Sequence, residues 1–356
     1  MRETTDSVLT ETRGSVEVPR DPHDRSVMLA DVLAGLRLPQ KELSPKYFYD
    51  TRGSELFEQI TRLDEYYPTR MERSLLEQWM PIWVDEFRPA ALVELGAGSA
   101  EKSRIVLDAM SAYETGKLYV PVDVSGEFLH DTARRLRVEY DGLQVEPEVA
   151  DITETLEISV PLPRPSWLAL LGSTIGNFDP VGAVRLLCRV ARQLRPGDRF
   201  LMGADLRPGS RKTVQRVELA YNDAAGVTAE FNLNVLRVLN RELGADFDLD
   251  AFEHRAFYAA DHSRIEMHLE ARSRQVVKFP NGAGSVRIAR GESIRTEISC
   301  KYDRPTIECL FSDAGLSVER WVEDSQGFFA LILATRAKPG PVEPFRAPTG
   351  LVRDGI

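Results

Sequence analysis

Between residues 90 and 205 the chain alternates short apolar runs with longer segments of helical periodicity. The apolar runs have the length of buried strands, which we expect at 90–95, 117–123, 143–149, 167–171 and 199–204. The segments between them have helical period or length, notably 101–110, 127–140 and 181–194. Strands that alternate with helices predict an α/β fold with a parallel, doubly wound sheet and right-handed crossovers.

The segment before the first strand predicts three helices. Two short ones are expected at 27–36 and 54–60. For the third, Thr69 is a suitable N-cap because Glu72 stands in the capping-box position, and the helix should extend to about Trp83. Pro68 is expected to hold Tyr67 in an extended conformation before this helix.

After residue 205 the pattern changes. An amphipathic helix is expected at 228–243, alternating strands at 265–271 and 296–300, a helix at 309–314, and two strands at 316–322 and 328–334 around a turn at 323–327. The last two strands form a hairpin that we expect to return to the sheet as an antiparallel edge. The segment between the fifth strand and this hairpin is therefore predicted to be an inserted second α+β domain.

Polar or small residues follow the predicted parallel strands. They are Gly96, Asp123, Asp151, Asn177 and Asp205. Parallel sheets bind ligands at the carboxyl ends of their strands, so a functional site is expected where these residues meet. Each one alone also fits ordinary loop chemistry, and it is their recurrence that favours a site.

The stretch 92–102, Leu-Val-Glu-Leu-Gly-Ala-Gly-Ser-Ala-Glu-Lys, combines a strand end, a Gly-x-Gly turn and a helix start. Glycines let the backbone approach a ligand, and a helix N-terminus offers free N–H groups. A nicotinamide dehydrogenase would place a third small residue at position 101, where this chain has Glu101. A carboxylate beside a pyrophosphate is unfavourable, so a ligand without phosphates fits better.

Composition limits the classes of partner. The 356 residues carry a formal charge of −10, which argues against nucleic acid and against an anionic membrane surface. An odd number of cysteines without a C-x-x-C pair suits a reducing cytoplasm. The scattered histidines predict no metal site. No apolar run is long enough for a membrane span, and the polar ends of the chain suggest disordered tails.

The acid-Leu-Gly-x-Gly pattern, with one acid ending the second strand and another after the third, resembles class I S-adenosylmethionine-dependent methyltransferases. Five stretches narrow the match: 46–57, 65–70, 171–177, 226–232 and 296–301. Together they resemble the histidine-specific methyltransferase family, the L-histidine Nα-methyltransferases of ergothioneine biosynthesis, from about Leu29 to Thr335. This resemblance implies a Rossmann-like fold and the conversion of L-histidine to its trimethylated betaine, hercynine, with S-adenosylmethionine as methyl donor.

The resemblance also implies site residues. The cofactor site would comprise Tyr49, Gly96, Lys102, Asp123, Asp151 and Ile152. The substrate site would comprise Phe57, Tyr66, Gly172, Thr174, Asn177, Tyr221, Met267, Glu297 and Ser299. Asn177 and Tyr221 would hold the histidine carboxylate, while Glu297 and Ser299, helped by Tyr66, would contact the imidazole. No catalytic residue is implied, and Tyr49 and Tyr66 are the candidates.

The residues themselves support these roles unequally. Glu297 and Ser299 are two positions apart on a predicted strand and therefore share a face, although a solvated face would explain them as well. Met267 lies on an apolar strand face, where core packing accounts for it. A cation such as Lys102 is mildly unfavourable near a helix start, which favours a role in holding the cofactor carboxylate.

We expect the following division of the chain: a tail at 1–26, the N-terminal part of the substrate domain at 27–70, the cofactor domain at 71–210, the inserted substrate domain at 211–300, the closing hairpin at 301–337 and a tail at 338–356. The protein is expected to be a cytoplasmic monomer that takes a small-molecule substrate. Two alternatives stay open. One is the same chemistry on another amino acid or small amine, and the other is a regulator that binds S-adenosylmethionine without catalysis.

Overall fold

The computed structural model describes residues 25–154, 156–280 and 282–337. Nearly all of the two expected tails lies outside these residues. The helices are α1 (Arg25–Leu36), α2 (Thr51–Thr61), α3 (Tyr67–Phe87), α4 (Glu101–Ala112), α5 (Gly126–Glu139), α6 (Pro180–Gln193), α7 (Val214–Leu219), α8 (Val227–Leu243) and α9 (Arg304–Ala314), with short 3₁₀ turns η1 (Pro45–Phe48), η2 (Thr174–Asn177), η3 (Leu249–Ala251) and η4 (Ala260–His262). The strands are β1 (Lys41–Glu42), β2 (Ala91–Leu95), β3 (Leu118–Asp123), β4 (Gln144–Val145), β5 (Glu148–Val149), β6 (Ser166–Leu170), β7 (Arg199–Asp205), β8 (Phe252–Ala259), β9 (Arg264–Ala271), β10 (Gln275–Phe279), β11 (Gly284–Ile288), β12 (Ser293–Cys300), β13 (Leu316–Glu323) and β14 (Phe329–Arg336).

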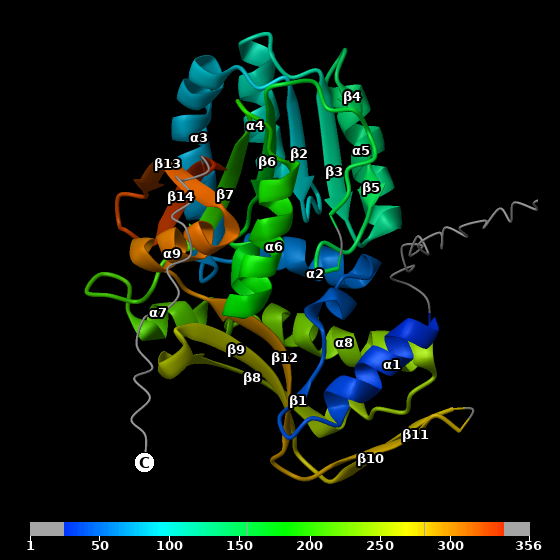
Figure 1. The fold of residues 1–356 in the computed structure, drawn as a ribbon. Coiled ribbons are helices and arrows are strands. Elements are labelled where there is room, and N and C mark those ends of the chain that lie inside the picture. Colours follow the sequence, from blue (N-terminus) through cyan, green and yellow to red (C-terminus); the bar gives the residue numbers. More distant parts are fainter. Residues whose placement is uncertain (1–24, 155, 281, 338–356) are drawn as a thin grey trace, which may run out of the picture.

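The large sheet has the strand order β13-β14-β7-β6-β2-β3-β4, and β5 also pairs with β3 (Figure 1). β2 is parallel to β3 and β6, and β6 is parallel to β7. β14 is antiparallel to both β7 and β13, which confirms the predicted edge hairpin. The strand expected at 143–149 is divided into β4 and β5, because Pro147 between them has no N–H to donate to the ladder.

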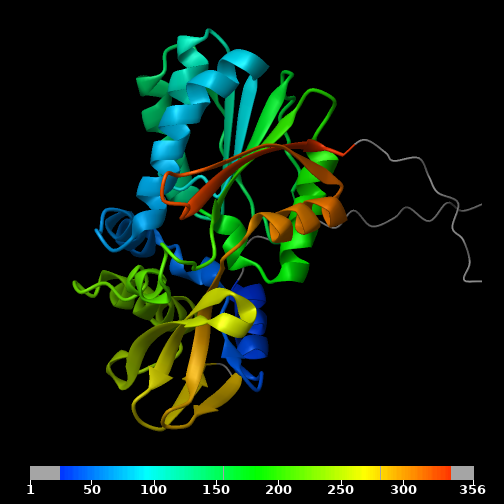
Figure 2. The ribbon, with the colours of Figure 1, turned by 90° about the vertical axis from the view of Figure 1, so that its left-hand side faces the viewer.

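Helices cover both faces of this sheet, as its uniformly buried central strands require. On one face α3, α4 and α5 pack around a core that includes Trp83 and Trp167. On the other face α6 and α9 pack around a core that includes Phe200 and Phe311. The two layers of helices lie on opposite sides of the sheet in Figure 2.

A second, smaller sheet has the order β1-β12-β9-β8 and lies below the large sheet in Figures 1 and 2. Its core joins the N-terminal helices to α8 and β9. The four residues predicted to share one face of β9, Ile265, Met267, Leu269 and Ala271, all lie in this core. Burial itself does not alternate along the strand, because Glu266 and His268 are buried as well. β8 was not expected. It pairs with β9 along its full length and lies at the edge of the sheet. Buried and exposed residues alternate only weakly along it, so its sequence pattern did not indicate a strand.

The predicted start of α3 is wrong. Tyr66 is the N-cap and Tyr67 is already helical, with Pro68 in the first turn, where its missing N–H costs nothing. Thr69 and Glu72 therefore form no capping box. Glu72 is instead fully buried, and its carboxylate points toward the large sheet, where a Cβ added to Gly203 would meet it. None of the described helices has the length and apolarity needed to cross a membrane.

Candidate active site

A cavity of about 540 Å³ opens between the two sheets, at the carboxyl ends of β2, β3 and β6. The large sheet supplies the glycine turn, the strand-end acids and the loop after β6, while α2, η1 and β12 supply the opposite side. All but one of the predicted site residues line it: Tyr49, Phe57, Tyr66, Gly96, Lys102, Asp123, Asp151, Ile152, Gly172, Thr174, Asn177, Tyr221, Glu297 and Ser299.

The glycine turn and Asp123 form one end of the cavity. Gly96 and Gly98 have φ values of +74° and +50°, and no atom lies within 4 Å of a Cβ added to Gly98, so the turn opens to the cavity. Asp123 Oδ2 accepts the N–H of Gly98 and Oδ1 accepts that of Ser125, each at 3.0 Å. Burial raises the pKa of Asp123 despite these bonds. The backbone N–H of Val124 also contributes a hydrogen bond to this carboxylate. A carboxylate held in this way at a strand end fits the hydroxyls of a ribose, which donate hydrogen bonds.

Asp151 connects the loop after β5 to the N-terminal segment. Its Oδ1 accepts the backbone N–H and the hydroxyl of Thr153, at 2.8 and 2.6 Å. Its Oδ2 lies 3.2 Å from Lys46 Nζ, in η1. The adjacent Ile152 lines the cavity, and its carbonyl accepts a hydrogen bond from Arg189. Asp151 and Ile152 therefore form a fixed wall next to Asp123.

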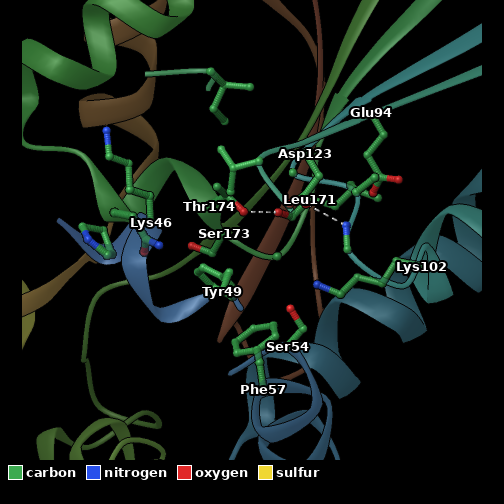
Figure 3. Close-up of a pocket in the computed structure, with 18 of the residues that line it drawn as sticks. Lys46, Tyr49, Ser54, Phe57, Glu94, Lys102, Asp123, Leu171, Ser173 and Thr174 are labelled. Atoms are coloured by element: carbon green, nitrogen blue, oxygen red, sulfur yellow. Dashed lines mark hydrogen bonds between the residues drawn. The ribbon is translucent and has the colours of Figure 1, made fainter. Parts of the chain in front are cut away.

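Lys102 extends from the start of α4 into the cavity (Figure 3). Its ammonium lies 2.6 Å from Glu72 Oε2. The Glu72 carboxylate also accepts the backbone N–H of Gly172, at 2.8 and 2.9 Å from its two oxygens. Glu72 was not among the predicted site residues, yet it connects a cofactor candidate to a substrate candidate.

Aromatic rings line the side of the cavity formed by the N-terminal segment. Tyr49 and Phe57 are in edge contact at 5.9 Å between ring centroids, Phe57 and Tyr66 at 6.3 Å, and Tyr66 and Tyr221 at 6.1 Å. In Figure 3 the rings of Tyr49 and Phe57 face the space into which Lys102 extends. Burial, reinforced by nearby acidic groups, raises the pKa of Tyr49 and Tyr66 well above the usual range, so both phenols stay neutral.

β12 brings Glu297 and Ser299 to the same cavity, after an irregularity in its pairing with β9 between Arg295 and Glu297. Burial raises the pKa of Glu297 to about 7, and the charge of Lys301 opposes this rise. Within the described ranges, no group donates a hydrogen bond to the Glu297 carboxylate. It is therefore available to accept one from a ligand.

Asn177 lines the cavity at the end of η2, in the loop that follows β6. A Cβ on the neighbouring Gly176 would lie 2.8 Å from the carbonyl oxygen of Cys300, so glycine is required for this loop to approach β12 closely. This close approach brings the loop that carries Asn177 beside the strand that carries Ser299. In the part of the chain that is described, the Asn177 amide has no hydrogen-bond partner.

Met267 is the exception among the predicted residues. It is 1% exposed, pairs with Glu297 across the sheet and belongs to the core of the second unit, without lining the cavity. Met267 is therefore a core residue of the smaller sheet, which agrees with its place on the apolar face of the predicted strand.

Sequence reasoning missed the buried groups behind the cavity. Lys301 is 1% exposed and bonds both Ser299 and Tyr221. It stands in a matched stretch, but its sequence neighbours carry no signal for a buried ammonium. Asp205 was noted only as a strand-end acid, and it proves to be fully buried between Lys301 and Lys212.

The described residues contain no group of three or more His, Cys, Asp or Glu side chains arranged to hold a metal ion. The strand order with its antiparallel edge hairpin, the glycine turn and the two strand-end acids define a class I S-adenosylmethionine-dependent methyltransferase. A family model described as "Histidine-specific methyltransferase, SAM-dependent" matches residues 28–336. The chain belongs to this family.

Relatives agree with this assignment. The chain is 44% identical to a histidine N-alpha-methyltransferase of Mycolicibacterium smegmatis and 43% identical to one of Mycobacterium tuberculosis, in each case over 86% of this chain and 94% of the relative. It is 29% identical to ergothioneine biosynthesis protein 1 of Neurospora crassa, over 83% of this chain and 33% of that longer protein.

Proposed function

We propose that this protein transfers three methyl groups from S-adenosylmethionine to the α-amino group of L-histidine, forming hercynine in the first step of ergothioneine biosynthesis. Membership of the histidine-specific family supports the reaction. The observation that carries the choice of substrate is the Glu297 carboxylate, which lines the same cavity as the Ser299 hydroxyl and the Asn177 amide. Among the described residues, neither this carboxylate nor this amide has a hydrogen-bond partner. Glu297 and Ser299 can hydrogen-bond a polar ring, and Asn177 can hydrogen-bond the carboxylate of an amino acid.

In this proposal, one end of the cavity holds the cofactor, which supplies an electrophilic methyl group on a sulfonium. Asp123 accepts hydrogen bonds from the ribose hydroxyls, and the turn at Gly96 lies against the amino-acid part of the cofactor. Lys102 has N–H donors beyond the one directed at Glu72, and these are available to a carboxylate. Asp151 and Ile152 contact the adenine, and Tyr49 closes the site from the opposite side.

The other end of the cavity holds histidine. Asn177 and Tyr221 bind its carboxylate, and Glu297 and Ser299 bind the two ring nitrogens with help from Tyr66. The remaining lining residues, Phe57, Gly172 and Thr174, shape the space around the substrate. A site that hydrogen-bonds a polar ring rejects apolar analogues, because its own buried groups then remain unpaired.

The chain orients the amine rather than supplying a strong base. An α-amino group has an ordinary pKa of about 8, so removal of its proton at neutral pH is inexpensive and water can accept it. The phenols of Tyr49 and Tyr66 stay neutral and do not act as bases. Holding the substrate at both ends presents the same nitrogen three times, and the aromatic faces stabilise the cationic products.

We propose that the protein acts as a monomer on small molecules, because one chain supplies residues for both the cofactor end and the substrate end of the cavity. Cys188, Cys300 and Cys309 are free thiols, in keeping with the reducing cytoplasm.

A competition assay tests the proposal. The purified protein is mixed with S-adenosylmethionine and all twenty amino acids at equal concentration, and the products are identified by mass spectrometry. Trimethylhistidine is expected as the dominant product. Methylation of a different amino acid would overturn the substrate assignment and the roles of Glu297 and Ser299. No methylated product, with the cofactor still bound, would overturn the reaction itself.

A further inference from the structure

Lys301 is a fully buried ammonium directly behind the substrate end of the cavity. Its Nζ lies 2.8 Å from Asp205 Oδ2, 3.0 Å from the Tyr221 hydroxyl and 2.9 Å from Ser299 Oγ. A lysine ammonium has three N–H donors and no acceptor, so these three contacts use all of them. Burial disfavours the charged form, but the Asp205 carboxylate outweighs this and raises the pKa of Lys301 above its ordinary value.

This arrangement limits what the two hydroxyls offer to a ligand. Both oxygens accept from Lys301, and the two hydroxyls also bond each other at 2.8 Å. That mutual bond uses one of their two hydrogens. The Ser299–Tyr221 pair is therefore left with one hydroxyl hydrogen to donate, whichever of the two donates in the mutual bond.

We propose that Lys301 is a positioning residue for histidine binding, which holds the Ser299 and Tyr221 oxygens as acceptors so that the pair presents a single, directed hydrogen to the substrate. The inference rests on the proposed function of these two side chains. Without the ammonium, each hydroxyl is free to rotate, and the pair loses the fixed pattern that an imidazole or a carboxylate must match. Substrate binding must then also order the two hydroxyls, which makes the binding free energy less favourable.

Lys212 provides a matched control. It is also buried, at 2% exposure, and it bonds the same Asp205 carboxylate, but its other hydrogen bonds are to the backbone carbonyls of Leu206 and Phe328. Its ammonium also lies 4.7 Å from the centroid of the Tyr67 ring. Removing either lysine leaves Asp205 with one ammonium and with the hydroxyl of Tyr67, 2.9 Å away. The two variants therefore disturb the ion cluster alike, and only one of them touches the substrate-binding hydroxyls.

The experiment compares Lys301→Met with Lys212→Met by calorimetry. The dissociation constant of S-adenosylhomocysteine is measured first, and that of histidine is then measured with S-adenosylhomocysteine saturating. Lys301→Met is expected to raise the histidine constant about tenfold or more while the S-adenosylhomocysteine constant stays within about twofold. Lys212→Met is expected to leave both within about twofold, although both variants lower the melting temperature.

The inference is overturned if the dissociation constant of histidine rises equally in the two variants, because a purely structural role predicts this result. It is also overturned if this constant is unchanged in Lys301→Met. If Lys301→Met does not fold, Lys301→Gln replaces it. A glutamine amide has two N–H donors for three acceptors, so a rise of about threefold or more is expected, and an unchanged constant overturns the inference. Failure of the wild-type protein to bind histidine would instead overturn the proposed function.

Discussion

The ammonium of Lys102 lies 2.6 Å from Oε2 of Glu72, whose carboxylate also accepts the backbone N–H of Gly172. Glu72 is fully buried, whereas the Lys102 side chain is 22% exposed toward the cavity. A single carboxylate on α3 thus fixes the start of α4 and the loop after β6 relative to each other. These two segments carry the proposed cofactor and substrate contacts, so their geometry depends on a residue that lines neither.

This relationship predicts the effect of Glu72→Gln. The amide keeps an acceptor for Gly172, but it loses the charge that holds Lys102, so the free energy of unfolding should fall by about 1–3 kcal/mol. Urea denaturation measures this change. Calorimetry with S-adenosylhomocysteine should show weaker binding as well, because Lys102 is no longer held in place. An unchanged unfolding free energy and an unchanged affinity would show that the pair does not organise the site.

Asn177→Ala should remove measurable histidine binding while S-adenosylhomocysteine still binds. The amide is proposed to hold the substrate carboxylate, and its loss leaves a charged group without its partner. Asn240→Ala is a suitable control, because the Asn240 amide, near the far end of α8, bonds the backbone of Phe247 and does not line the cavity. Calorimetry on both variants checks the prediction, and retained histidine affinity in Asn177→Ala would contradict the carboxylate role.

Glu297→Ala should change selectivity rather than only affinity. Histidine should lose roughly 2–3 kcal/mol of binding free energy, because its ring N–H loses a buried ionic acceptor, while leucine should lose little or gain. Competition for methylation between the two amino acids measures the ratio of kcat/KM. Equal losses of kcat/KM for histidine and leucine would contradict the proposed contact between Glu297 and the imidazole.

The buried acids also predict how stability depends on pH. Burial raises the pKa of Glu297 and of Glu94 to about 7, from an ordinary value of 4.5. The unfolded chain releases these protons near pH 4.5 and the folded chain holds them until about pH 7. Each group therefore lowers the free energy of unfolding as the pH rises through this interval, by up to about 1.4 kcal/mol per pH unit.

The lowered pKa values of His254 and His268 act in the opposite direction below pH 6.5, so the test compares variants rather than absolute curves. Glu297→Gln removes one of the raised carboxyls and keeps its shape. Urea denaturation at pH 5, 6 and 7 should show a smaller loss of stability with rising pH in the variant than in the wild type. Parallel curves for the two proteins would mean that Glu297 ionises normally.

Local sequence pattern determined the elements whose hydrophobic periodicity is clear. The alternation of apolar runs and helical segments was sufficient for the large sheet, and strand periodicity placed Glu297 and Ser299 on one face, where both line the cavity. The antiparallel closing hairpin was also predicted, because a turn and two apolar strands follow each other directly. In these cases the information lies within a few neighbouring residues.

Tertiary structure alone decided what depends on burial and on distant partners. Glu72 looked like a capping residue, yet it bonds Gly172, which is 100 residues away, and α3 begins before Thr69. Lys301 and Tyr221 are 80 residues apart and meet because the segment after α7 packs against the smaller sheet, next to the end of β12. The free energy of such contacts comes from desolvation and charge pairing in the folded core, which no sequence neighbour reports.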